Sequence, residues 1–149
     1  MTAFTFSPLV QGYWRLGQWN MTSRQLLDFV HQHLELGIDT VDHAHVYGQP
    51  SCEALFGEAM GIEPSLRDRL KIVSKCGIVL ASDNSPSASV NYYNTSASAI
   101  FDSVHNSLKR LRTDRLDLLL IHRPDYLLQA EEVALAFSRL KACLLYTSP

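Results

Sequence analysis

Four side chains at the ends of three apolar runs have the types and spacing of an acid–base site. Asp42 and Tyr47 follow one run, Lys75 interrupts the next, and His122 ends a third. A lysine beside a tyrosine favours the phenolate and lowers the phenol's pKa from its usual value of about 10. At about 4 Å and an effective dielectric near 20, this attraction reaches roughly 4 kcal/mol. With Asp42 holding the lysine charged and in place, the set predicts a proton donor for a carbonyl oxygen near neutral pH.

Each of these residues also has a plainer explanation when it is taken alone. Asp42 is of a type that caps a following helix, Tyr47 of a type that packs in loops, and His122 of a type that is satisfied within cores. Lys75 is harder to explain in this way, because a lysine within a buried strand needs a partner or an open cavity. The joint placement of the four at successive strand ends favours chemistry over these separate explanations.

The elements that must position these side chains alternate along the sequence. Short apolar runs predict four strands, and an amphipathic helical pattern follows each of them. The expected strands are Leu9–Leu16, Ile38–Val46, Leu70–Val79 and Leu116–His122. The first expected helix begins at a cap on Thr22 or Ser23 and ends at Gly37, and the second runs from Ser51 to Gly61. The third carries the apolar stripe Ile100–Leu111, and the fourth carries Val133–Leu140. The polar stretch Ala81–Asn94, which includes Tyr92 and Tyr93, predicts a loop on the substrate side.

This order of elements predicts a parallel sheet covered by helices. The unbroken apolar stretch Leu118–Ile121 is typical of a strand that is buried on both faces. The pattern fits a doubly wound sheet or a (β/α)8 barrel, and a barrel needs about 250 residues, so this chain would supply roughly half of one. In both architectures chemistry gathers at the C-terminal ends of the strands, where the four titratable residues lie.

The composition restricts the class of protein. The 149 residues are 46% hydrophobic and 19% charged, with a formal net charge of -2, which indicates one globular domain. No basic excess is present to neutralise nucleic-acid phosphates, and no apolar run reaches the ~20 residues that a membrane span needs. Cys52, Cys76 and Cys143 are too far apart for a metal-binding Cys-x-x-Cys pair. Without a recognisable signal peptide, the expected location is the cytoplasm.

Four motifs, in order from about Val10 to Leu140, resemble those of the aldo-keto reductases. They are GYWRLGQWN after the first expected strand, DTVDHAHVYG at the end of the second, IVSKCG in the third and LDLLLIHRPD in the fourth. The resemblance implies an α/β fold made of the first four β/α units of a (β/α)8 TIM barrel. It also implies NADPH as cofactor and the reduction of aldehydes or ketones, with a small carbonyl compound as substrate.

The resemblance also implies a role for each motif residue. Tyr47 would be the proton donor, Lys75 would lower its pKa, Asp42 would pair with the lysine, and His122 would orient and polarise the carbonyl. Hydride would come from the nicotinamide, since the cofactor carries that chemistry. The residues expected near the cofactor are Gly12, Tyr13, Trp14 and Asp42.

The end of the sequence departs from the family pattern. We expect residues 1–141 to form the partial reductase domain, and residues 142–149 to be a non-native tail, because CLLYTSP fits neither the helix nor the family. The strands that should stack on the nicotinamide and bind the adenosine phosphates lie beyond this segment in the family. We therefore expect the 149-residue chain to be inactive by itself. Its first and fourth strands would be open edges, which are templates for self-association.

Two other hypotheses remain open at this stage. His43 and His45 form a His-x-His pair at a strand end, a pattern with which barrel hydrolases hold a divalent metal. Against this, Asp42 and His43 cannot face the same side of a regular strand. A non-enzymatic binding module related to the reductases is the other hypothesis, and no residue in the sequence names its partner.

Overall fold

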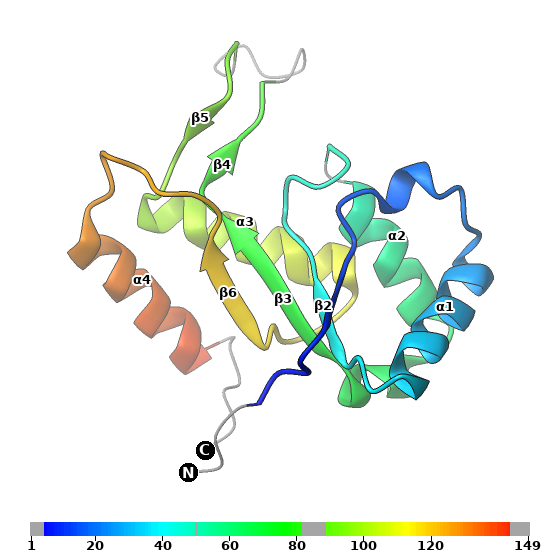
Figure 1. The fold of residues 1–149 in the computed structure, drawn as a ribbon. Coiled ribbons are helices and arrows are strands. Elements are labelled where there is room, and N and C mark those ends of the chain that lie inside the picture. Colours follow the sequence, from blue (N-terminus) through cyan, green and yellow to red (C-terminus); the bar gives the residue numbers. More distant parts are fainter. Residues whose placement is uncertain (1–4, 50, 82–88, 144–149) are drawn as a thin grey trace.

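The computed structural model describes residues 5–49, 51–81 and 89–143 and places a parallel sheet at the centre of the fold (Figure 1). The sheet has the strand order β1-β2-β3-β6, and every neighbouring pair is parallel. The bounds of these strands are Val10–Gly12 for β1, Thr40–Asp42 for β2, Lys71–Cys76 for β3 and Leu118–Ile121 for β6. As predicted, the first and last of them are the edges of the sheet.

Four α-helices connect or follow these strands. They are α1 (Ser23–Glu35), α2 (Ser51–Met60), α3 (Ala97–Leu111) and α4 (Ala130–Cys143), with short 3-10 helices at Leu16–Gln18 (η1) and Pro64–Arg69 (η2). Thr22 caps α1 in a capping box with Gln25, which decides between the two expected caps. Ser96 caps α3 by accepting a hydrogen bond from the backbone N–H of Ala99.

The two faces of the sheet differ sharply in burial. One face packs on the helices, and its side chains Val41, Ile72, Cys76 and Leu119 belong to the hydrophobic core. The opposite face carries Asp42, Lys75 and Leu120, and Leu120 is 38% exposed. Because side chains alternate along a strand, the unbroken apolar run of β6 is divided between these faces. The prediction that this strand is buried on both faces is therefore wrong for the described residues.

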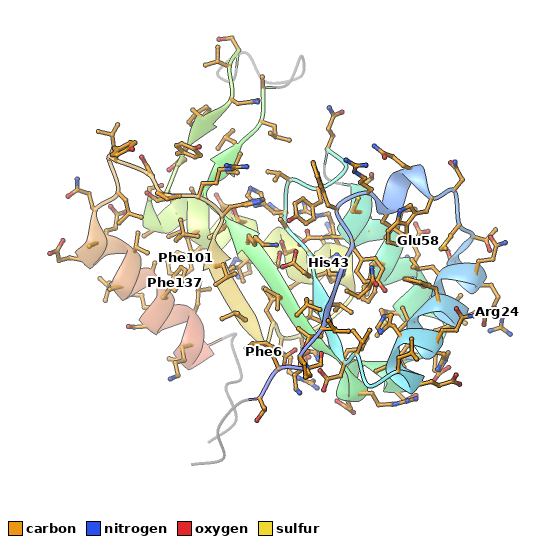
Figure 2. The ribbon with its side chains drawn as sticks, in the orientation of Figure 1. Phe6, Arg24, His43, Glu58, Phe101 and Phe137 are labelled. Carbon is orange, nitrogen blue, oxygen red and sulfur yellow. The ribbon has the colours of Figure 1, made fainter. Side chains whose placement is uncertain are left out.

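The helices pack into one continuous core. Phe56, Leu66, Ile100 and Leu111 have no more than 1% of their surface exposed. Phe101 of α3 and Phe137 of α4 pack against this core and lie where those two helices meet (Figure 2).

The third expected strand is divided into two strands. β3 ends at Cys76, and Gly77 takes a φ of +98°, which glycine adopts readily because it has no Cβ. Beyond it, β4 (Ile78–Val79) pairs antiparallel with β5 (Tyr92–Tyr93), so the expected loop contains a strand. This hairpin stands beyond the C-terminal end of β3 (Figure 1). Residues 82–88 of the loop lie outside the described residues.

The other expected strands are longer than the observed ones. The structure turns away from the sheet after Gly12 and enters η1 at Leu16. At the other end of the chain, α4 continues through Ala142 and Cys143, two residues past the expected domain boundary. The rest of the expected tail, residues 144–149, lies outside the described residues.

Candidate active site

The Lys75 ammonium group is the centre of a hydrogen-bonded cluster at the C-terminal edge of the sheet. Its Nζ donates to Asp42 Oδ1 at 2.6 Å, to the His43 carbonyl oxygen at 2.8 Å and to the Tyr47 hydroxyl oxygen at 3.1 Å. An ammonium group has three hydrogens, so these contacts use all of them. The lysine is mostly buried, and the Asp42 carboxylate compensates its charge.

The register of the sheet brings these groups together. Asp42 ends β2 and Lys75 lies near the end of β3, on the same face of two neighbouring parallel strands. Tyr47 belongs to the loop after β2, which folds back through hydrogen bonds from Tyr47 N to Ala44 O and from Cys52 N to Tyr47 O. Gly48 follows with a φ of +66°, and a Cβ there would lie 2.6 Å from Ser51 Oγ. The turn that orients the phenol therefore requires glycine.

The direction of the hydrogen bonds suits proton donation by Tyr47. Because its oxygen accepts a hydrogen from Lys75, the phenol hydrogen must point elsewhere. The contact from the Tyr47 hydroxyl to Asp42 Oδ1 is 3.5 Å, longer than a good hydrogen bond. The phenol hydrogen thus remains available to a substrate, and the nearby ammonium stabilises the phenolate that donation would leave.

His122 lies directly beside the phenol. Its ring meets the Tyr47 ring edge to face, with 5.6 Å between the ring centroids. Burial lowers the pKa of His122, and the charge of Lys75 lowers it further, so the neutral imidazole is favoured. Its buried Nδ1 has no hydrogen-bond partner among the described residues. The structure therefore brings Asp42, Tyr47, Lys75 and His122 together at one edge of the sheet.

Of the four residues expected near the cofactor, Gly12, Tyr13 and Trp14 separate in the structure. Gly12 lies beside Asp42 in the sheet, and a Cβ placed on it would meet no atom within 4 Å. Trp14 is 62% exposed, and its ring centroid lies 6.5 Å from that of Tyr47.

Tyr13 instead points into the core. It has no exposed surface, stacks on the His43 ring and forms a 3.0 Å hydrogen bond with His33 Nε2. Burial raises the pKa of this phenol above its usual value. Its side chain therefore cannot contact a nicotinamide, and this corrects its expected place in the cofactor site.

The two histidines expected to bind a metal, His43 and His45, also lie in different surroundings. His43 is fully buried on the helix-covered face, and Figure 2 labels it beside β2. Both ring nitrogens of His45 instead face backbone carbonyl oxygens, those of Lys75 and Ile78. Within the described residues, no group of three or more His, Cys, Asp or Glu side chains is arranged to hold a metal ion. The hydrolase hypothesis is therefore contradicted by the geometry.

A buried ion pair supports the site from behind the sheet, and the sequence prediction missed it. Glu53 of α2 is completely buried, accepts a hydrogen bond from Ser74 Oγ at 2.8 Å and pairs with Arg110 Nε of α3 at 2.9 Å. Ser74 directly precedes Lys75 on β3. The pair thus joins two helices to the strand that carries the lysine. The one sequence signal for it was a glutamate among the inward positions of a short helix.

The comparisons with known proteins agree with this geometry. A profile of the Aldo/keto reductase family matches residues 8–143. The chain belongs to the aldo/keto reductase family. It is 53% identical over 135 residues to oxidoreductase YdhF of Escherichia coli and 48% identical over 136 residues to the uncharacterized oxidoreductase YcsN of Bacillus subtilis. Both alignments cover 91% of this chain and 45% of the relative, so the chain spans about half the length of these curated relatives.

Solved structures confirm the predicted fold class. A putative aldo-keto reductase from Pseudomonas aeruginosa matches with a TM-score of 0.78 and 30% identity, over 97% of this chain and 54% of its own. The holo form of an aldo-keto reductase from Bacillus halodurans matches with a TM-score of 0.74 and 26% identity, over 93% of this chain and 43% of its own. The described residues therefore form the first four β/α units of a (β/α)8 aldo/keto reductase barrel. Within those residues, no helix is long and apolar enough to cross a membrane.

Proposed function

We propose that this sequence supplies the proton-donating half of a reductase that uses NADPH to convert aldehydes or ketones into alcohols. The observation that carries the proposal is the position of Lys75 Nζ, 2.6 Å from Asp42 Oδ1 and 3.1 Å from the Tyr47 hydroxyl. A phenol with a lysine donating to its oxygen is a general acid for a carbonyl oxygen that gains negative charge.

In this mechanism each residue has a separate task. Tyr47 donates its hydroxyl hydrogen to the substrate oxygen, and the ammonium of Lys75 stabilises the resulting phenolate. Asp42 keeps the ammonium charged and oriented. The neutral His122 ring beside the phenol provides a hydrogen-bonding nitrogen that orients the carbonyl. Together these residues bind and orient one carbonyl group and deliver one proton to its oxygen.

The described residues fit the reactive end of a nicotinamide cofactor. The open space over Gly12 adjoins Asp42, and the buried Nδ1 of His122 has no hydrogen-bond partner in the described residues. The exposed Trp14 ring forms a wall next to Tyr47. NADPH bound there would supply the hydride. We assign Gly12, Trp14 and Asp42 to this end of the cofactor site.

A hybrid protein tests the proposal. In it, residues 1–141 replace the matched segment of E. coli YdhF, whose remaining sequence completes the chain. We expect the hybrid to oxidise NADPH in the presence of an aromatic aldehyde such as 4-nitrobenzaldehyde, as followed by absorbance at 340 nm. The same assay with NADH tests the choice of cofactor. We expect the 149-residue chain to show no turnover in parallel assays.

Replacing the proton donor gives the sharpest test of this mechanism. Tyr47→Phe in the hybrid should lower kcat by about 10²–10⁴-fold, since a positioned general acid contributes about that much. Phenylalanine keeps the ring, so NADPH affinity should be preserved. Tyr126→Phe, which makes the same change at a fully exposed position, is the matched control and should retain full turnover. Near-normal turnover of Tyr47→Phe would disprove the assigned role.

We further propose that the reductase acts in the cytoplasm. The thiols of Cys52 and Cys76 are free and buried, which is consistent with a reducing compartment. Fractionation of cells that express a tagged full-length protein would test this, and recovery outside the cytoplasmic fraction would contradict it.

A further inference from the structure

The His45 side chain is held at both ends of its ring by backbone carbonyl groups. Nδ1 lies 2.6 Å from the carbonyl oxygen of Lys75, and Nε2 lies 2.7 Å from that of Ile78. The backbone N–H of His45 also donates to the Lys75 carbonyl oxygen at 3.3 Å. His45 thus ties the loop that carries Tyr47 to the segment that follows Lys75.

The chemistry of these two contacts specifies the form of the ring. Carbonyl oxygens only accept hydrogen bonds, and a neutral imidazole has a single N–H. Both contacts are hydrogen bonds only if each nitrogen carries a hydrogen, which is the positively charged form. Donor–acceptor distances of 2.6 and 2.7 Å are also those of hydrogen bonds to charged groups. In the neutral form, one nitrogen lone pair would face a carbonyl oxygen at this short distance.

The two carbonyl groups lie on either side of the turn where the chain leaves the sheet. Lys75 is in β3, Ile78 begins β4, and Gly77 with its φ of +98° lies between them. The β4–β5 hairpin extends from this turn beyond the end of the sheet, and Gly77 O accepts a hydrogen bond from Asn94 N as the hairpin returns. A residue that fixes both carbonyl groups therefore fixes how the hairpin stands relative to Tyr47.

We propose that His45 is a positioning residue whose doubly protonated ring clamps the β3–β4 turn and so holds the β4–β5 hairpin over the reactive groups. Loss of one ring hydrogen releases one carbonyl group and loosens the hairpin. The expected effect on turnover rests on the proposed reductase activity, whereas the clamp concerns the structure alone.

The elements next to His45 carry several charged and titratable groups. Lys75 belongs to β3 and Asp42 to the end of β2, while His122 and Arg123 follow β6. Tyr92 and Tyr93 are on the hairpin itself. After burial and the Lys75 charge, the charge of His45 is a further cause of the lowered pKa of His122. A charged His45 thus helps to keep the neighbouring imidazole neutral.

Nuclear magnetic resonance of the 149-residue chain with ¹⁵N-labelled histidine tests the charge of the ring directly. At pH 6 we expect both ring nitrogens of His45 to show the shifts and the one-bond coupling of N–H groups. The Asn94 amide, which donates to Gly77 O beside the clamped turn, should exchange slowly in the same sample. A ring with one bare nitrogen at pH 6 would overturn the proposal.

A matched pair of variants tests the positioning role. His45→Phe keeps an aromatic ring but donates no hydrogen bond, whereas His105→Phe makes the same change at an exposed position on α3. In the hybrid, we expect His45→Phe to lower kcat/KM by up to about 10²-fold, as small displacements of reacting groups do. It should also make exchange of the Asn94 amide faster. The control should match the parent in both measurements, and equal behaviour of the two variants would contradict the clamp.

These measurements separate the clamp from the proposed function. A doubly protonated ring in a hybrid that reduces no carbonyl compound would refute the function and leave the clamp standing. An active hybrid with a neutral His45 ring at pH 6 would refute the clamp alone. If His45→Phe does not fold, the ring-nitrogen shifts of the parent chain still test whether the His45 ring is doubly protonated.

Discussion

The two faces of the central sheet have opposite characters. The helix-covered face is closed, and the buried side chains of Glu53 and Ser74 pair with each other there. The open face carries Asp42, Lys75 and an exposed Leu120 on the same strands. The comparison teaches that the closed face fixes the strand that carries Lys75, whereas Asp42, the His43 carbonyl group and Tyr47 hold its ammonium group. The closed face fixes the strands, and the open face presents their chemistry.

The largest expected effect on stability comes from the buried ion pair of the closed face. Glu53→Ala leaves Arg110 and the buried Ser74 without their acceptor, and should cost about 3 kcal/mol of unfolding free energy. Asp114→Ala is the matched control, because Asp114 is 83% exposed where it pairs with Arg115, and such pairs contribute about 1 kcal/mol or less. Urea unfolding of both variants measures the difference, and equal costs would erase the contrast between the two kinds of ion pair.

The next effect is a pH dependence of the unfolding free energy, which originates on the closed face. Burial lowers the pKa of His43 to about 3, so between that pH and the ordinary histidine value the unfolded chain binds more protons than the folded one. Stability should therefore fall as the pH falls through this range, with a slope of up to about 1.4 kcal/mol per pH unit from this residue. His43→Phe should flatten the curve and, by removing two nitrogens without partners, raise stability at neutral pH.

Unfolding curves measured from pH 7 to pH 4 test this expectation. His105→Phe, which changes an exposed histidine, should retain the pH dependence of the parent chain. An unchanged slope in His43→Phe would show that the acid sensitivity arises elsewhere.

The last effect concerns the association of two chains through the open face, and it is expected to cost the least stability. Among the described residues, β1 and β6 form the edges of the sheet, and Leu120 of β6 is 38% exposed. We expect the 149-residue chain to pair with a second copy, because exposed edges beside apolar surface promote association. Leu120→Lys should shift this equilibrium to the monomer, since the pairing would bury an unpaired charge. Light scattering after size-exclusion chromatography measures the mass, and a monomeric parent chain would contradict the expectation.

The sequence predicts the order of elements and the residues at the strand ends because both depend on local patterns. An apolar run followed by a helical stripe gives a β/α unit, and parallel packing gathers the ends of such strands at one edge. The aldo-keto reductase motifs then place Asp42, Tyr47 and Lys75 in the same region. The structure adds the contacts between their atoms.

Other features depend on where a strand ends and which way its side chains point, or on partners that are distant in the sequence. Gly12 and Tyr13 are neighbours in the sequence, but the chain turns away from the sheet after Gly12 and the Tyr13 ring enters the core against His43, so a motif alone misplaces Tyr13. Glutamate is usually a surface residue, and the burial of Glu53 is explained only by its contacts with Ser74 and Arg110, which are distant in the sequence. The β4–β5 pairing involves two short strands separated by a long loop, which hydrophobic periodicity does not detect.

The tight turn at Gly48 sets a practical rule for anyone who wishes to redesign the proposed active site. A side chain at that position would collide with Ser51 and Cys52, and the loop would relieve the collision by displacing the phenol one residue earlier. Gly48 is therefore a position that a mutational library should leave unchanged. The exposed ring of Trp14, which lies beside the same phenol and is free of such collisions, is the position at which a library can explore new substrates.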